Sequence, residues 1–383
     1  MAGAGAGTAW KKGMKIGLDG RMLTLKLSGI GRYSLNLCQG LSRLAAAPEI
    51  EILPSVQAEV PAGVSRSPRY ISENALWRAC FSIPAWAKDR RLDLYHATNY
   101  GAGPLRPMPV PWILTIHDLF PITHPEFFPR YFSYRAAWLL RRHISRADWL
   151  ISDSRFTAEE MAALLGADRQ KISVVHCGID LEFWTPKDPG LEKQVLESHG
   201  LKGPYLLFVG VLNPRKNLLG LLKAFNQLVL ENQHLDHRLV LAGASYYKAD
   251  ELLKFVRENR LQDKVIFTGF VRDESLPALY RGATAFVFPS FFEGFGFPAL
   301  EAQAAGTPVI ASNTSSIPEV CSPSTILVDP QKPEEIAQAI HRVLNDSSLR
   351  SRMISQGMAF SRKLNWQTTA AETLSVYKKL LSR

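Results

Sequence analysis

Two glutamates and two glycines follow one apolar run at a spacing that suits the binding of a phosphorylated ligand. The segment covers residues 288–302 and reads FPSFFEGFGFPALEA. A predicted strand ends near Pro289, and Pro298 suits the first position of a helix. Glycines let backbone amides approach a ligand closely, and a helix N-terminus favours negative charge. The segment therefore predicts a diphosphate cradle built on Gly294 and Gly296.

The two glutamates of this segment have different predicted roles. Glu293 lies in the loop at the mouth of the cradle, whereas Glu301 lies about one turn into the helix. There its carboxylate can accept hydrogen bonds from a ribose diol. Seven residues separate the two acids, so they do not form a close carboxylate pair. The alternative is that Glu293 caps the helix and Glu301 is solvated, but the whole constellation favours a ligand site.

Two adjacent cations follow another predicted strand. The segment 208–217 reads FVGVLNPRKN: a strand, a turn, Arg215 and Lys216, then a helix that Asn217 caps. Arg offers a planar fork and Lys a point charge, which together suit a leaving diphosphate. The alternative is an ordinary solvated basic turn.

Two further motifs follow strands in the first half of the chain. Residues 28–34 (SGIGRYS) resemble a phosphate-binding glycine loop through Gly29 and Gly31, although Ser34 replaces the third glycine of the dinucleotide fingerprint. His117 and Asp118 end a strand, where polar residues of such sheets face the ligand. His117 can contact a sugar hydroxyl there. The alternative for residues 28–34 is a flexible turn. The alternative for His117 is a histidine at a strand end whose hydrogen bonds are all made within the protein.

Short apolar runs alternate with helix-like stretches through both halves of the chain, which indicates parallel sheets covered on both faces. The predicted strands are 14–19, 50–54, 92–97, 112–117, 149–153 and 172–176, then 205–211, 238–242, 265–270, 285–289, 308–311 and 326–329. The predicted helices include 32–45, 130–146, 217–230, 249–260, 298–305, 333–344 and 365–381. A stretch rich in Pro, Gly and charge over 185–203 predicts a linker. We therefore expect two doubly wound α/β domains in tandem with an active-site cleft between them.

Length and composition exclude several classes of protein. The length of 383 residues suggests two or three domains. A composition of 46% hydrophobic and 21% charged residues is typical of a soluble globular protein and excludes a disordered or fibrous one. The four cysteines are far apart, which argues against a disulfide framework or a structural zinc site. Neither the pair Asp180 and Glu182 nor the histidines His96, His124 and His176 have supporting metal-ligand spacing. No apolar run reaches about 18 residues, so no membrane-spanning helix is expected.

The formal net charge of +10 is compatible with nucleic acid, anionic lipid or phosphorylated substrates as partners. The predicted helix 130–146 is basic and amphipathic, which suits contact with an anionic membrane, although a solvated basic face explains it equally. Residues 1–13 lack the order of a secretory signal and are interpreted as a disordered leader. The expected location is the cytoplasm, with peripheral contact at the inner face of the cytoplasmic membrane.

Taken together, these motifs resemble the retaining nucleotide-sugar glycosyltransferases of family 4, which have the GT-B fold of two Rossmann-like domains. The resemblance runs from about residue 14 to the end of the chain. It rests on residues 288–302, on GTPVIAS and PEV over 306–312 and 318–320, on the Arg215-Lys216 turn, and on MKIGLDGR over 14–21. Residues 210–217 are similar to a bacterial mannosyltransferase branch that builds O-antigen and exopolysaccharide. Many relatives carry Arg where this chain has Val211.

The resemblance implies a role for each candidate residue. Donor-binding residues would be Gly29, Gly31, Phe270, Val271, Gly294, Phe295, Gly296, Phe297, Pro298, Ala299 and Glu301; His117, Arg215, Lys216 and Glu293 would be catalytic, and Asp118 would lie on the acceptor side. The implied domains are an acceptor-side domain over 14–184, a nucleotide-sugar domain over 204–364, and a helix over 365–383 that packs back on the first domain.

The predicted activity is transfer of a hexose, with retention, from a nucleotide diphosphate sugar to a glycan or lipid-linked saccharide during cell-surface polysaccharide synthesis. GDP-mannose is the expected donor and a UDP-sugar the main rival. The donor is a co-substrate, so no cofactor is expected, and the lack of an Asp-x-Asp motif predicts that no divalent metal is required. The alternatives are a nucleotide-sugar epimerase of the same fold and a non-catalytic nucleotide- or glycan-binding subunit. Nucleic-acid binding rests on net charge alone and is not predicted.

Overall fold

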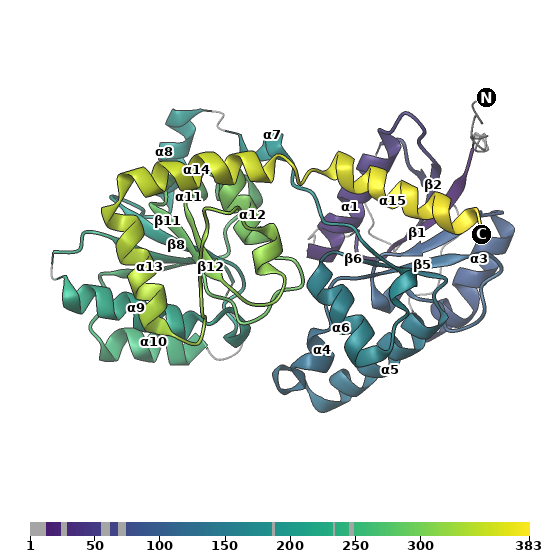
Figure 1. Ribbon diagram of the computed structural model, residues 1–383, viewed down its shortest axis with the longest axis horizontal. Helices are drawn as coiled ribbons and strands as arrows, with labels where there is room; N and C mark the ends of the chain where they lie inside the picture. Colours follow the sequence, from purple (N-terminus) through teal and green to yellow (C-terminus); the bar gives the residue numbers. More distant parts are fainter. Residues whose placement is uncertain are drawn as a thin grey trace, which may run out of the picture. The chain divides into compact units, whose positions relative to one another are not determined.

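The chain folds into two compact units, each built on one parallel sheet (Figure 1). The computed structural model describes residues 13–23, 29–54, 62–67, 74–185, 188–232, 234–244 and 249–383. The predicted leader, except Gly13, and Ser28 of the glycine loop lie outside these residues. The first unit comprises Met1–Asp153, Ala158–His176 and Trp366–Arg383; the second comprises Ser154–Thr157 and Cys177–Asn365.

The first unit holds a sheet of seven parallel strands in the order β3-β2-β1-β4-β5-β6-β7. The strands are β1 (Lys15–Gly20), β2 (Glu49–Pro54), β3 (Ser65–Arg66), β4 (Leu94–Ala97), β5 (Trp112–Ile116), β6 (Trp149–Ser152) and β7 (Ile172–Val174). The helices are α1 (Gly29–Ser42), α2 (Ala75–Trp77), the π-helix η1 (Arg78–Ser82), α3 (Ile83–Asp89), α4 (Phe120–Thr123), α5 (Arg130–Arg146) and α6 (Arg155–Leu165). The buried side chains of Trp86 on α3, Tyr95 on β4 and Leu140 on α5 belong to its core, where helices pack on the central strands.

The second unit holds six parallel strands in the order β10-β9-β8-β11-β12-β13. They are β8 (Tyr205–Val209), β9 (Arg238–Ala242), β10 (Val265–Gly269), β11 (Ala285–Phe288), β12 (Val309–Ser312) and β13 (Ile326–Val328). The helices are α7 (Leu181–Trp184), α8 (Pro189–Ser198), α9 (Leu218–Glu231), α10 (Ala249–Glu258), α11 (Leu276–Gly282), α12 (Phe297–Ala304), α13 (Pro333–Asn345) and α14 (Ser347–Ser361). The side chains of β8 and β11 are fully enclosed, because helices cover both faces of the sheet.

The strand order of each sheet reverses direction at its middle. In the first sheet the chain builds outward from β1 to β3 on one side and from β4 to β7 on the other; in the second, β8 and β11 are the two inner strands. Loops after such adjacent strands leave in opposite directions and open a crevice at the carboxyl edge, where ligands of these folds bind. The predicted doubly wound architecture is confirmed, and all twelve predicted strands are present with ends that shift by two residues or fewer.

The predicted linker over 185–203 is wrong. Its centre forms α8, because Asp188 caps the helix by accepting a hydrogen bond from the amide of Gly190, and Pro189 occupies the first turn. The helix is tied to the second unit where the Nε of Arg281 donates to the carboxylate of Glu192 at 2.9 Å. These residues therefore belong to the second unit.

The last helix, α15 (Trp366–Leu381), belongs to the first unit and packs along α1. A Cβ atom on Gly40 of α1 would lie 2.8 Å from the carbonyl oxygen of Trp366, so the two helices approach more closely than a larger residue permits. The hydroxyl of buried Tyr377 lies 2.7 Å from Nδ1 of His96, which joins α15 to β4. The end of the chain is therefore a structural part of the first unit.

Candidate functional site in the second unit

A buried ion-pair network joins the loops after the two inner strands of the second sheet. Lys216 donates from Nζ to Oε1 of Glu293 at 2.6 Å, and Arg215 donates to Oε2 of the same carboxylate at 3.0 Å. Arg215 also donates to the carbonyl of Phe292 at 2.8 Å. Both cations lie in the loop after β8 and the acid in the loop after β11, at the reversal of strand order. The three predicted catalytic residues of this unit thus form one cluster.

The environment of this network shifts the pKa values of Glu293 and Lys216. Burial alone would raise the pKa of Glu293, but Lys216 and Arg215 outweigh it, so the pKa lies below its ordinary value. Burial lowers the pKa of Lys216, and Arg215 adds to that effect while Glu293 opposes it. The cluster carries one excess positive charge when all three groups are ionised. It is therefore suited to an anion placed beside it.

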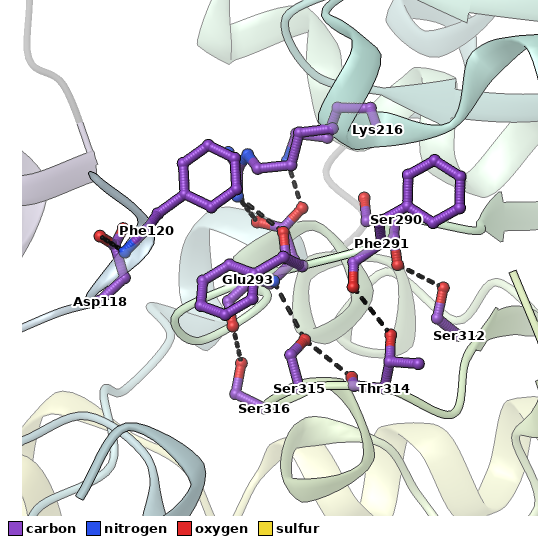
Figure 2. A network of polar contacts seen from close by, with 12 residues as sticks. Asp118, Phe120, Lys216, Ser290, Phe291, Glu293, Ser312, Thr314, Ser315 and Ser316 are labelled. Carbon is purple, nitrogen blue, oxygen red and sulfur yellow. Dashed lines mark hydrogen bonds and ion pairs between the residues drawn. The ribbon is translucent and has the colours of Figure 1, made fainter. Parts of the chain in front are cut away.

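A row of hydroxyl groups from the end of β12 and the loop after it holds the backbone around Glu293 in place (Figure 2). Ser315 accepts from the amide of Glu293 at 3.0 Å, and Ser316 donates to its carbonyl at 2.8 Å. Thr314 donates to the carbonyl of Phe291 at 3.1 Å, and Ser312 to that of Ser290 at 2.6 Å. Sequence reasoning missed these supports, although the polar run SNTSS directly after a predicted strand carried the signal.

The predicted cradle and ribose-binding acid lie at the start of α12. Gly296 precedes the helix with φ of 104°, a left-handed conformation that favours glycine, and a Cβ there would lie 3.1 Å from the side chain of Val320. Glu301 is 7% exposed, and the hydroxyl of Tyr280 donates to its Oε2 at 3.1 Å. The alternative of a solvated Glu301 is therefore wrong. The helix begins at Phe297, so Pro298 holds its second position and not its first.

Two glycines bring the ends of β8 and β9 into close approach near this cluster. Gly243 has φ of 153°, and a Cβ on it would lie 1.9 Å from the carbonyl oxygen of Gly210. The next loop, after β10, carries Phe270 and Val271, which were predicted to border the base. Phe270 is 74% exposed and Val271 is buried. A flat exposed ring suits stacking on a base, whereas Val271 contributes packing.

In the first unit, His117 is held by two protein groups at the carboxyl edge of the sheet. Its Nδ1 pairs with Oδ2 of Asp153, and its Nε2 donates to the carbonyl of Thr98 at 2.8 Å. The register of β5 and β6 pairs Ile116 with Ser152, so His117 and Asp153 leave the sheet side by side. Both ring nitrogens are engaged, so the predicted contact with a sugar hydroxyl would require one of these bonds to break. Sequence reasoning missed Asp153.

The other predicted residues of the first unit lie at the starts of helices. Asp118 accepts a hydrogen bond from the amide of Phe120 at 3.1 Å, at the start of α4. Gly29 and Gly31 form the first turn of α1, and a Cβ on Gly29 would meet open space. The backbone amide of Phe120 thus fixes part of the position of the Asp118 carboxylate, and none of the described residues around position 29 requires glycine there.

The pair of His117 and Asp153 predicts a pH-dependent contribution to stability. Burial alone would lower the pKa of His117, but Asp153 outweighs it, so the pKa lies above its ordinary value. A histidine with a raised pKa stabilises the fold fully below its pKa in the unfolded chain, about 6.5. This stabilisation is lost as the pH rises through its pKa in the folded protein. The native protein should therefore have a higher free energy of unfolding than Asp153→Asn. This difference should be largest below about pH 6.5 and should become smaller as the pH rises above that value.

Urea unfolding between about pH 6 and pH 9 measures this gap. The exposed Asp263→Asn is the matched control and should give a small difference that does not follow this trend. A gap for Asp153→Asn that stays constant over the range would show that His117 is neutral in the folded protein.

Comparisons with known proteins show the family to which the chain belongs. Residues 193–360 match the family model of "Glycosyl transferases group 1", and residues 27–183 match "Glycosyltransferase Family 4". The chain is 31% identical over 391 aligned residues to the O-antigen chain mannosyltransferase B of Escherichia coli, covering 96% of this chain and 100% of the relative. The chain belongs to glycosyltransferase family 4.

Solved structures place the family 4 chain in the GT-B fold. Sucrose-phosphate synthase from Thermosynechococcus elongatus aligns with a TM-score of 0.76 at 21% identity, over 96% of this chain and 99% of that one. HepE from Anabaena, solved with UDP and glucose, aligns with a TM-score of 0.72 at 19% identity, over 94% of this chain and 99% of that one. The predicted family and fold are thus confirmed.

Proposed function

We propose that this family 4 glycosyltransferase transfers mannose from GDP-mannose, with retention at the anomeric carbon, to a saccharide acceptor in cell-surface polysaccharide synthesis. The similarity to the O-antigen chain mannosyltransferase B, over 96% of this chain and the whole of that relative, supports the sugar and the pathway class. The observation that carries the proposal is the cluster of Arg215, Lys216 and Glu293 where the second sheet reverses its strand order.

The reaction breaks the bond between the anomeric carbon and the donor phosphate, so negative charge grows on the leaving diphosphate. Arg215 and Lys216 supply the charge that stabilises it, and the N-terminus of α12 adds backbone amides of the same polarity. Glu301, already held by Tyr280, would accept hydrogen bonds from the ribose hydroxyls. A carboxylate that bridges two cations can also turn its oxygens toward the hydroxyls of the donor sugar, which is the role proposed for Glu293.

No side chain described here needs to form a covalent intermediate. The acceptor hydroxyl attacks the anomeric carbon on the face that the diphosphate leaves, and a phosphate oxygen of the donor takes its proton. The bond to the acceptor oxygen forms as the bond to phosphate breaks, and the products are the glycoside and GDP. The proposed reaction needs no divalent metal, because Arg215 and Lys216 provide the positive charge.

The test is product analysis with GDP-mannose and UDP-glucose as donors and a mannose-terminated saccharide as acceptor, with and without a chelator. The expected product gains one mannose in the α configuration by NMR, from GDP-mannose only, and chelation leaves the yield unchanged. Arg257→Met, at an exposed arginine of α10, serves as an active control. A sugar nucleotide that rearranges without acceptor would identify an epimerase, and binding without turnover would identify a non-catalytic subunit.

A further inference from the structure

The outer face of α5 exposes a row of aromatic rings. Tyr131, Tyr134 and Trp138 are 74%, 76% and 53% exposed, and their spacing of three and four residues places them on one side of the helix. The opposite side of α5 buries Leu140 and Ile144 in the core of the first unit. Figure 1 shows α4 and α5 next to one another in that unit. A contiguous group of exposed aromatic rings on a protein surface is typical of an interaction site.

A second group of exposed apolar residues joins this row. The guanidinium of Arg142 donates to the carbonyl of Leu105 at 2.6 Å, which brings the segment before β5 against α5. The next residue, Arg106, lies over the ring of Phe81 at 4.2 Å from its centroid. Phe81 in turn contacts Trp77, with ring centroids 4.5 Å apart. We call the surface formed by Trp77, Phe81, Arg106, Tyr131, Tyr134 and Trp138 the aromatic–arginine face.

Among the described residues that form this face, the charged side chains have one sign. Helix α5 contains five arginines and no acidic residue, and neither Asn74–Ser82 nor the pair Leu105 and Arg106 contains Asp or Glu. Exposed Arg130, Arg135 and Arg141 lie on α5 beside the aromatic row. The face therefore complements an extended negative surface.

We propose that the aromatic–arginine face docks the protein on an anionic lipid bilayer. Tyr and Trp rings favour the boundary between headgroups and acyl chains, and arginines are attracted to anionic headgroups. Leu76, 65% exposed beside Trp77, adds aliphatic surface that suits acyl chains and has no use in contacting phosphates. In the described part of the chain no helix has the length and apolar character to cross a membrane. The contact is therefore one in which α5 lies along the bilayer surface.

Flotation of the full chain with vesicles of phosphatidylcholine, alone or mixed with phosphatidylglycerol, tests the proposal. The native protein should float with the mixed vesicles at low salt, and less so as salt rises. Each arginine near an anionic surface is worth about fivefold in binding, so Arg130→Gln, Arg135→Gln and Arg141→Gln together should weaken it about a hundredfold. Combined Tyr131→Ala, Tyr134→Ala and Trp138→Ala should also release the protein.

The matched control replaces Arg257, Arg342 and Arg352, three exposed helical arginines of the second unit, by Gln. It should float like the native protein. An equal loss in this control would show that net charge alone attracts the protein, and no flotation of the native protein would also overturn the proposal. A dimer in solution that the aromatic variant abolishes would assign the face to a second copy of the chain. All variants should keep nucleoside diphosphate binding, so a failure here is distinguishable from failure of the proposed transfer reaction.

Discussion

Replacing Arg215 by Met is expected to lower kcat/KM for sugar transfer on the order of 10²–10³-fold, since one charge that stabilises the leaving diphosphate is lost. The shorter contact of the network, from Lys216 to Glu293 at 2.6 Å, stays in place, so the fold should persist. The loss should fall mainly on kcat, because the charge on the leaving group grows in the transition state. Steady-state rates of GDP release with saturating acceptor measure this.

Two variants make the result specific to Arg215. Arg215→Lys keeps the charge but loses the planar fork and should recover part of the rate. Arg257→Met removes an exposed arginine of α10 and should leave kcat unchanged. If Arg215→Met raised KM alone, or had no effect, Arg215 would not act on the departing diphosphate.

Replacing Glu293 by Ala is expected to lower the free energy of unfolding by about 3–5 kcal/mol at neutral pH, because two neighbouring cations lose their buried counter-charge. Glu293 is 6% exposed and so is Lys216. Because the pKa of Glu293 is lowered in the folded protein, its carboxylate stabilises the fold at pH values above 4.5, its pKa in the unfolded chain. This stabilisation is lost as the pH falls through its pKa in the folded protein. The difference from the native protein should therefore shrink in acid. Urea unfolding at neutral and acidic pH measures both effects.

An exposed ion pair of the same unit provides the control for this prediction. Glu258 lies 3.8 Å from Lys254 on α10 with both side chains largely exposed, so Glu258→Ala should change the stability little. Equal effects of the two substitutions would mean that the network around Glu293 is solvated in the folded protein.

The sequence predicted the sheets well because parallel strands that are buried on both faces are nearly continuous apolar runs. The run YLLFV of β8 and the run AFVF of β11 are examples, and both form fully enclosed strands. Strand β3 was not predicted, because Ser65 and Arg66 are polar and exposed at the edge of the sheet. Helix α8 was predicted as a linker because its Asp-Pro-Gly start resembles a turn. Asp followed by Pro is also typical of the start of a helix.

The candidate site was predictable in composition but not in its pairings. The motifs placed Arg215, Lys216 and Glu293 at strand ends, yet their contact depends on which strands are neighbours in the sheet. The same holds for His117 and Asp153, which are 36 residues apart and meet through the register of β5 and β6. Strand order and register are set by packing over the whole unit, and a local motif does not carry that information.

The second unit should bind a nucleoside diphosphate through the cluster at its sheet edge and through Glu301. Calorimetric titration of the native protein, Glu301→Ala and Glu301→Gln with GDP, UDP, ADP and TDP measures this binding. We expect that GDP binds the native protein, that Glu301→Ala binds GDP about tenfold or more weakly, and that the affinity of Glu301→Gln, whose side chain can still accept from Tyr280, lies between the two. If the folded native protein bound none of the four, or bound GDP no better than Glu301→Ala does, the second unit would not hold the nucleotide in this way.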